Sequence, residues 1–302
     1  MHPVITKWYS SFLPERKQRV KVGKTKSEWI QTNGGVPQGT LSGPELFIHM
    51  MSDLQTIVPN VKFVDDMSVI EIIEKGTVSE MPLSTNQVVK WSSENELDIN
   101  TSKTKELLIS FGKEPDVPCL VMNGTEIEQV DQAKLLGVII SKDLKWDAHI
   151  AYINGKASRR PFYLRQLKYA GLSKKDLVRV YKALIRPVCE YACPVWSTCL
   201  TSELSDCLES IQKRAVKIIL PNVSYAAGCD ELDLESLLHR RQQLCKSFFR
   251  AMTLPTHRLH NMLPVKKQSK YNLRTQQIYE LPKCKTNRYK NSFIPWCLFN
   301  AQ

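Results

Sequence analysis

Residues 60–73 read NVKFVDDMSVIEII, and this stretch decides how the first half of the chain is interpreted. Residues 60–63 and 68–73 are rich in β-branched and aromatic side chains, and Asp65 and Asp66 separate the two runs. The pattern predicts a tight β-hairpin with both carboxylates at or near its tip. Adjacent carboxylates repel each other, so a divalent cation, Mg²⁺ (or Mn²⁺), is their natural partner. A solvated acidic turn is the alternative.

The segment before this hairpin combines a glycine-rich loop with a helix start. Residues 33–39 read NGGVPQG, which is too rich in Gly and Pro for a regular element. Ser42 followed by Pro44 and Glu45 predicts a capped helix through Leu54. Further upstream, apolar residues at helical spacing predict a helix that stops at Pro14, followed by strands at 18–22 and 28–32.

The rest of the first half alternates between helix and strand patterns. We expect a helix at about 83–97 and strands near 106–111, 119–122, 125–129 and 134–141. Asn123 and Gly124 predict a type I′ turn between two of these strands. The first half therefore combines helices with largely antiparallel hairpins.

The second half has a helical period. One apolar stripe follows a cap at Ser173 and Asp176 and should end at Pro187, and further stripes cover 204–219 and 234–252. Pro161 should end or kink the helix that contains it. The chain as a whole is expected to have an α+β fold.

The charge is uneven along the chain. Of 302 residues, 42 are Lys or Arg and 30 are Asp or Glu, for a net charge of +12. Residues 1–150 have 16 basic and 20 acidic side chains, whereas residues 151–302 have 26 and 10. This excess in the second half favours a polyanionic partner, above all nucleic acid. Hydrophobic residues make up 42%, which argues against a disordered chain.

Composition also bears on location and on metals. No run approaches the ~18 apolar residues of a membrane span, and the first residues lack a signal-peptide layout, so we expect an intracellular protein without membrane partners. The nine cysteines contain no C-x-x-C pair. Buried free thiols are therefore favoured over a zinc site.

Several separate motifs occur in one order along the chain. They are GGVPQGTLSGP (34–44), SDL (52–54), KFVDD (62–66), NTSKTK (100–105), KLLGVIISKDLKW (134–146), IRPVCEYACPVW (185–196) and IQKRAVKIIL (211–220). This set resembles the reverse transcriptases of non-LTR retrotransposons of the jockey and CR1-like kind. The resemblance implies RNA-directed DNA polymerase chemistry on a partial right-hand palm (1–145), a helical thumb (146–263) and a basic C-terminal tail (264–302).

The resemblance also implies roles for individual residues. Asp65 and Asp66 match the carboxylates that bind catalytic metal ions. Lys103 matches a residue near the triphosphate, although a solvated lysine at a strand edge is as compatible with the sequence. The resemblance implies that the loop positions the template and the nucleotide, and a plain helix-entry loop is the alternative. It also implies that a later strand contacts the primer, although core packing alone could explain that strand. These residues are Gly35, Pro37, Gln38 and Gly39 in the loop, and Leu136 and Gly137 in the strand.

The basic tail interleaves aromatic and basic side chains, which suits stacking on bases and following a phosphate backbone. A solvated end of the chain is the alternative. Its candidate nucleic-acid-binding residues are Lys266, Lys267, Lys283, Lys285, Arg288 and Lys290.

One part of the family pattern is missing. The resemblance places a further catalytic aspartate in a motif upstream of GVPQG, and residues 1–33 resemble only the helix and hairpin between that motif and GVPQG. The expectation is a truncated polymerase that is inactive alone, whose parent protein supplies fingers, the rest of the palm or an endonuclease. A non-catalytic nucleic-acid-binding remnant and a broken reading frame whose product never folds are the alternatives. The expected partners are an RNA template, a DNA primer or target and deoxynucleoside triphosphates, in the nucleus or a cytoplasmic ribonucleoprotein.

Overall fold

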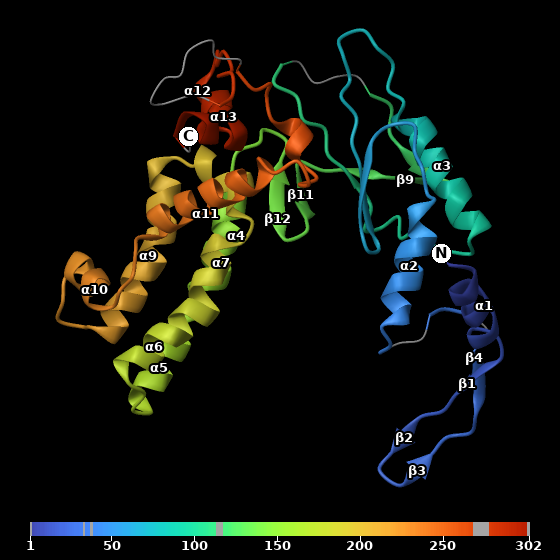
Figure 1. The fold of residues 1–302 in the computed structure, drawn as a ribbon, viewed down its shortest axis with the longest axis horizontal. Coiled ribbons are helices and arrows are strands. Elements are labelled where there is room, and N and C mark those ends of the chain that lie inside the picture. Colours follow the sequence, from blue (N-terminus) through green and yellow to red (C-terminus); the bar gives the residue numbers. More distant parts are fainter. Residues whose placement is uncertain (1, 33, 37–38, 113–116, 268–277, 301–302) are drawn as a thin grey trace. The chain divides into compact units, whose positions relative to one another are not determined.

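A computed structural model of the chain describes residues 2–32, 34–36, 39–112, 117–267 and 278–300 (Figure 1). The chain forms two compact units. Unit 1 comprises Met1–Glu106 and Pro115–Gln129, and unit 2 comprises Leu107–Glu114 and Val130–Gln302. The described residues mix helices and strands, in agreement with the α+β expectation. No described helix is both long and apolar enough to cross a membrane.

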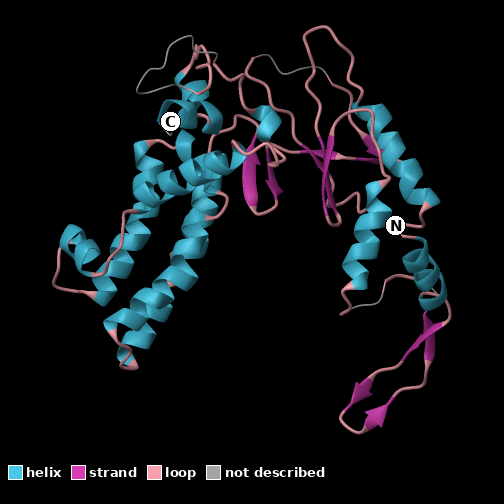
Figure 2. Cartoon of the chain, viewed as in Figure 1, coloured by secondary structure: helices cyan, strands magenta, loops and turns pink. Residues whose placement is uncertain are grey.

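Unit 1 contains three helices and short strands in its described part, drawn in cyan and magenta in Figure 2. Its helices are α1 (Pro3–Phe12), α2 (Ser42–Ser52) and α3 (Met81–Glu94). Its strands are β1 (Arg16–Gln18), β2 (Lys21–Val22), β3 (Thr25–Lys26), β4 (Ile30–Thr32), β5 (Asn60–Phe63), β6 (Asp66–Val69), β7 (Lys105–Glu106), β8 (Val121–Met122), β9 (Thr125–Glu126) and β10 (Glu128–Gln129). The pairs β1–β4, β2–β3, β5–β6 and β8–β9 are antiparallel, and β7–β10 is parallel.

The first two predicted strands are not continuous, so this prediction was wrong. The segments 18–22 and 28–32 are broken into two ladders, β1–β4 and β2–β3, which form one long ribbon in Figure 1. At the break, the Val20 amide donates to the Ser27 hydroxyl at 2.9 Å, while the Ser27 amide donates to the Val20 carbonyl at 2.9 Å. The side-chain hydroxyl thus takes the place of a backbone partner and interrupts the ladder.

The later strands of unit 1 are also shorter than predicted. Within the predicted strand 106–111 only Glu106 is in a strand, as the second residue of β7. The predicted strand 125–129 is split into β9 and β10, which pair with different partners. The type I′ turn is confirmed, because Asn123 and Gly124 have φ of 50° and 74°.

Unit 1 has a small core. Leu120, Met122 and Ile127 pack together with partly buried residues of α3. Large apolar side chains such as Trp8, Trp29 and Phe63 stay about half exposed or more, at 50%, 56% and 59%. Hydrophobic stabilisation scales with buried apolar area, so unit 1 gains little of it from its own residues.

Unit 2 is mainly helical. It has one strand pair, β11 (Gln132–Leu135) with β12 (Val138–Ser141), in its described part. Its helices are α4 (Asp147–Ala157), α5 (Pro161–Tyr169), α6 (Lys174–Val180), the π-helix η1 (Tyr181–Ile185), α7 (Arg186–Glu190), α8 (Cys193–Trp196), the 3₁₀ turn η2 (Ser197–Cys199), α9 (Ser202–Ile219), α10 (Tyr225–Glu231), α11 (Leu237–Met252), the 3₁₀ turn η3 (His260–Met262), α12 (Asn287–Asn291) and α13 (Phe293–Asn300). The predicted division placed 130–145 with the first part of the chain, whereas β11 and β12 lie in unit 2.

The two proline predictions have different outcomes. The break at Pro161 is confirmed, because α4 ends at Ala157 and Pro161 is the first residue of α5. The prediction that a helix ends at Pro187 was wrong. The ladder widens to the π-helix η1, in which the Arg186 amide donates to the Tyr181 carbonyl, and Pro187 then lies in the first turn of α7. A first-turn proline needs no amide donor, so the helical path continues through it.

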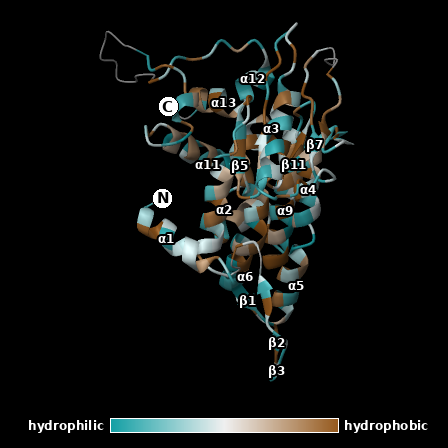
Figure 3. Ribbon diagram, turned by 90° about the vertical axis from the view of Figure 1, so that its right-hand side faces the viewer, coloured by the Kyte–Doolittle hydropathy of each residue, from teal (hydrophilic) through white to brown (hydrophobic). Residues whose placement is uncertain are grey.

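The core of unit 2 contains a buried polar network. The Tyr181 hydroxyl donates to the Gln212 side chain at 2.5 Å, and Gln212 donates to the Glu235 carbonyl at 2.9 Å. The buried Glu209 carboxylate accepts the backbone amides of Leu237 at 3.2 Å and Leu238 at 3.3 Å, at the start of α11. A carboxylate at this place satisfies amides that have no partner within the helix. In Figure 3 the apolar α13 is mostly brown, and its Cys297 and Leu298 are buried in this core.

Candidate functional site

The acidic pair lies at the end of the β5–β6 hairpin, as predicted. Phe63 pairs with Asp66, and Val64 and Asp65 form a two-residue turn. Val64 has φ of 56°, the positive value that the first central residue of such a turn needs. For a β-branched residue this conformation is strained, and strain of this kind concentrates at functional sites. Both carboxyl groups are exposed to solvent.

Contacts from both neighbouring helices hold the hairpin in place. The Lys62 ammonium on β5 donates to the Met51 carbonyl at 2.8 Å and to the Leu54 carbonyl, at the end of α2. Just before β5, the Val58 amide donates to the buried Ser84 hydroxyl of α3 at 3.2 Å. The base of the hairpin is therefore fixed on two sides, while its tip points into solvent.

The tip offers two carboxylates, which are donors of the kind that bind a divalent cation. Among the described residues there is no group of three or more His, Cys, Asp or Glu side chains that could hold a metal ion. Mg²⁺ binds through one or two carboxylates together with water and substrate phosphates, which Asp65 and Asp66 match. The described residues do not fit a site for two ions, since they bring no third carboxylate to this turn.

The glycine-rich loop is tied to β1. Gly35 and Gly39 have φ of 75° and 74°, which glycine adopts without strain. The Arg16 guanidinium donates to the Gly35 carbonyl at 2.5 Å and to the Leu13 carbonyl at 2.9 Å. The predicted site residues Pro37 and Gln38 lie outside the described residues.

A cavity of about 520 Å³ lies next to this loop. Its lining comes from the end of α1, from β1 and β4, from the loop, and from α2, and it includes Arg16, Gly35 and Met50.

The predicted cap of α2 was wrong in detail. Ser42 is the first helical residue and Leu41 precedes it without a capping side chain, while the Thr40 hydroxyl accepts the Gly43 amide at 3.2 Å.

Lys103 lies in a turn just before β7. The Asn100 side chain accepts the Lys103 amide at 3.1 Å and the Ser102 hydroxyl at 2.7 Å, which shapes this turn. The Lys103 side chain is exposed, and within the described part of the chain no carboxylate lies within ion-pair distance of it. It is thus available to an anion, and it does not lie on a strand edge.

Leu136 and Gly137 form a turn rather than the middle of a strand. The predicted single strand 134–141 is the hairpin β11–β12, because Leu136 and Gly137 both have positive φ, of 45° and 86°. The Tyr191 hydroxyl donates to the Leu136 carbonyl at 2.8 Å. A Cβ at Gly137 would lie 3.2 Å from the Tyr191 ring, which excludes a larger residue without a shift. These two residues belong to unit 2, whereas the acidic pair belongs to unit 1.

The described part of the basic tail belongs to unit 2. Lys266 pairs with Tyr279, and Lys283 and Lys285 precede α12. On α12, the Arg288 guanidinium lies 5.6 Å from the centre of the Phe111 ring, and the Lys290 ammonium 5.5 Å from that of Phe299. Lys267 extends the pairing at Lys266 by donating its amide to the Ile278 carbonyl at 2.9 Å.

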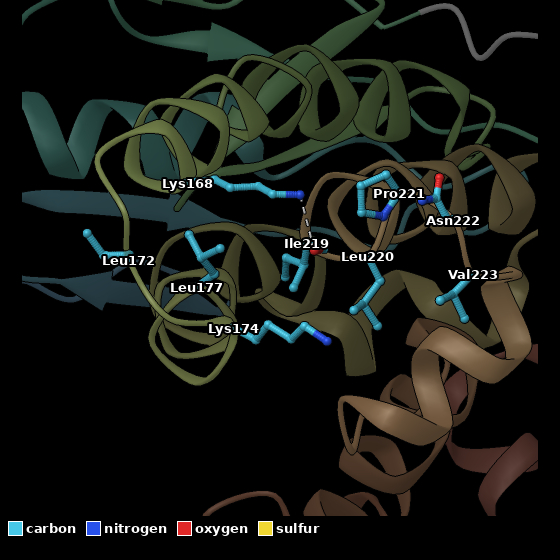
Figure 4. A pocket seen from close by; sticks show the side chains of 9 residues that line it. All are labelled: Lys168, Leu172, Lys174, Leu177, Ile219, Leu220, Pro221, Asn222 and Val223. Atoms are coloured by element: carbon cyan, nitrogen blue, oxygen red, sulfur yellow. Dashed lines mark hydrogen bonds between the residues drawn. The ribbon is translucent and has the colours of Figure 1, made fainter.

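A second cavity, of about 340 Å³, lies in unit 2 and contains none of the predicted site residues. Figure 4 shows its apolar lining and two lysines. The Lys168 ammonium donates to the Ile218 carbonyl at 2.6 Å, and Lys174 forms an ion pair with Glu231 at 2.9 Å. Both cations are engaged, so the cavity presents no evident chemistry.

Sequence reasoning did not identify two residues that shape these sites. The conformation of Val64 has no sequence signal, because β-branched residues normally avoid positive φ. Tyr191 is 55 residues from Leu136 in the sequence, and no local pattern links them.

Comparisons with known proteins agree on one family. The family model described as "Reverse transcriptase (RNA-dependent DNA polymerase)" matches residues 1–140. The chain is 23% identical over 253 residues to a probable RNA-directed DNA polymerase from transposon X-element of Drosophila melanogaster, covering 79% of this chain and 26% of that protein. It is 25% identical over 211 residues to the RNA-directed DNA polymerase from mobile element jockey of the same organism, covering 65% and 23%.

A third relative is the Pol polyprotein from type-1 retrotransposable element R1 of Bradysia coprophila, which is 25% identical over 70% of this chain and 22% of that protein. The chain therefore spans about a quarter of the length of these relatives. No solved structure matches it. Residues 1–140 thus match the reverse transcriptase family, and the chain is similar along most of its length to the RNA-directed DNA polymerases of retrotransposons.

Proposed function

We propose that this chain takes part in RNA-directed DNA synthesis, with the β5–β6 turn as its metal-binding catalytic element. The observation that carries the proposal is the strained turn at Val64, which presents Asp65 and Asp66 to solvent within the region that matches the reverse transcriptase model. A divalent cation bound there would supply charge neutralisation for the triphosphate and activation of the primer 3′-oxygen.

The other predicted residues have supporting roles in this proposal. Gly35 and Gly39 allow the backbone of their loop to approach template and nucleotide closely, and Pro37 and Gln38 complete that loop. Lys103, exposed and without a carboxylate partner in the described part, holds the triphosphate. The turn at Leu136 and Gly137 contacts the primer. Residues 1–145 act as part of a palm, 146–263 as a thumb, and 264–302 as a tail that follows the nucleic acid.

The proposal includes a contribution from outside this chain. Two carboxylates hold one ion through few bonds, and a third ligand would come from an upstream palm or fingers segment of a longer protein. We propose the nucleus or a cytoplasmic ribonucleoprotein as the place where template RNA, target DNA and deoxynucleoside triphosphates meet the protein.

A primer-extension assay tests the catalytic proposal. The chain is incubated with template RNA, DNA primer, the four deoxynucleoside triphosphates and Mg²⁺ or Mn²⁺, alone and with the upstream segment of a relative added in trans. With the upstream segment present, we expect extension that is lost in Asp65→Asn and kept in Asp53→Asn, since the Asp53 side chain accepts a hydrogen bond from Trp91 at 3.0 Å and lies outside the turn. Equal product from the wild type and Asp65→Asn would contradict the proposal.

A second candidate function is nucleic-acid binding without catalysis. The observation that favours it is the absence of a third ligand at the acidic turn within the described residues, combined with 26 basic against 10 acidic side chains in residues 151–302. Salt-dependent binding to an RNA–DNA hybrid, without extension under any condition above, would select this function.

A further inference from the structure

Two lysines of unit 2 converge on one tyrosine. The Lys134 ammonium on β11 lies 5.1 Å from the centre of the Tyr152 ring, and the Lys156 ammonium on α4 lies 4.6 Å from it. Tyr152 is half-buried and both lysines are exposed. Two cations and one phenol thus share a small area between β11 and α4.

The fold brings these residues together from two elements. Lys134 pairs with Ile139 in the β11–β12 register, and the Ile139 amide donates to His149 Nδ1 at 3.2 Å, which fixes the hairpin against α4. Tyr152 and Lys156 are four residues apart on α4, so they lie on the same face of the helix. The buried His149 thereby sets the position of Lys134 relative to that face.

Neither cation forms an ion pair within the described part of the protein. Within the described residues no carboxylate lies within ion-pair distance of Lys134 or Lys156, whereas the neighbouring Lys145 pairs with Asp143 at 3.5 Å. Hydrogen bonds from Lys156 and from Lys134 lower the pKa of the Tyr152 phenol. Like charges held together repel each other, and an anion between them removes that repulsion.

We propose that Lys134, Tyr152 and Lys156 form a binding site for a backbone phosphate of a nucleic-acid duplex. The two ammonium groups pair with the phosphate oxygens, and the Tyr152 hydroxyl donates a hydrogen bond to them. This inference rests on the proposed function, because a polymerase relative meets template and primer strands as its polyanion. The contacts are made to phosphate alone, so binding is independent of base sequence.

A binding assay tests the site. The full chain is titrated into a fluorescently labelled RNA–DNA hybrid at several salt concentrations, and its anisotropy is measured. For the double variant Lys134→Gln/Lys156→Gln we expect about tenfold weaker binding at low salt, uniformly across hybrid sequences, and a salt slope reduced by ~0.9 for each lost phosphate contact. Tyr152→Phe should weaken binding less. Restoring charge with Lys134→Arg/Lys156→Arg should recover most of the affinity.

The matched control is Lys142→Gln/Lys145→Gln, which also removes two charges, from lysines that have carboxylate partners. Equal affinity and salt slope for the double variant and this control would overturn the site. Vesicles with phosphatidylserine and free inorganic phosphate serve as further probes. A double variant that loses vesicle binding but binds the hybrid like the wild type would also overturn the inference.

The outcome is separable from that of the proposed function. Asp65→Asn lies in unit 1, and it should abolish extension while leaving hybrid affinity unchanged. Absence of extension by the wild type, with a normal loss of affinity in the double variant, would contradict the catalytic proposal and support the phosphate site. Normal extension with an unchanged salt slope in the double variant would support the catalytic proposal and contradict the phosphate site.

Discussion

Val64 takes a backbone conformation that β-branched residues rarely adopt, at φ of 56°, and it is 46% exposed. The strain costs roughly 1–2 kcal/mol, whereas Asn tolerates this region. We therefore expect Val64→Asn to stabilise the β5–β6 hairpin by about 1 kcal/mol, which corresponds to about fivefold slower hydrogen exchange of its amides.

Val61 provides the matched control for this substitution, because it lies on β5 of the same hairpin, is 59% exposed and has no positive φ. Val61→Asn removes a good strand former and should speed exchange instead. Faster exchange in Val64→Asn would show that the turn is not strained. If the strain serves catalysis, Val64→Asn also lowers extension activity while the hairpin becomes more stable.

His149 makes the stability of unit 2 depend on pH. Desolvation by burial lowers its pKa from the ordinary 6.5. The unfolded chain then takes up a proton at a pH at which the folded chain does not, so stability falls as the pH drops below about 6.5. We expect urea midpoints to decrease from pH 7 to pH 5, and to decrease less in His149→Asn. The exposed His239, in the variant His239→Asn, is the control, and equal pH dependence in both variants would contradict this role.

At the scale of elements, the β11–β12 hairpin depends on a glycine for two reasons. Gly137 has φ of 86°, and a Cβ there would approach the Tyr191 ring to 3.2 Å. Gly171 has nearly the same φ, 85°, with no atom within 4 Å of an added Cβ. Both Gly→Ala variants should lose roughly 1–2 kcal/mol from backbone strain, and Gly137→Ala should lose more, as measured by urea unfolding. Equal losses of stability in the two variants would mean that the Tyr191 ring moves aside at no cost in free energy.

The elements also show how far local sequence can predict structure. The hairpin at residues 60–69, the turn at Asn123 and Gly124 and the Ser173 cap were predicted, because each depends on residues close in sequence. The predictions fail where residues that are distant in the sequence determine the local structure. Tyr191 holds the Leu136 carbonyl and so stabilises a turn inside an apolar run. At Pro187, a widened helical turn accommodates the proline, which the apolar period alone does not reveal.

The same limit applies to the candidate site. The sequence predicted the acidic pair and its place at the hairpin tip, since both depend on adjacent residues. It did not indicate the convergence of Lys134 and Lys156 on Tyr152, which depends on strand register and on the contact of His149 with Ile139. Roles that came from the family resemblance remain predictions until the assays above are done.

For the whole molecule, the two units should differ in stability. The main core, with residues such as Leu208, Leu237 and Trp196, lies in unit 2, and the described core of unit 1 is a small cluster against α3. Amide exchange measured by mass spectrometry on the full chain should be at least about tenfold slower in α9 and α11 than in α3. Comparable protection of α3 would show that unit 1 is stabilised by more than its own core.

The division of the chain into units sets an order during synthesis. Residues 107–114 belong to unit 2 but precede the last part of unit 1, which ends at Gln129. Unit 1 is thus fully emerged from the ribosome while most of unit 2 is still untranslated, and at ~5–20 residues per second this interval lasts roughly ten seconds or more. Side chains such as Trp8 and Trp29 are exposed in the complete fold as well, so from this interval on they are open to chaperones or to neighbouring nascent chains. A chaperone that binds unit 1 can therefore act before unit 2 has folded.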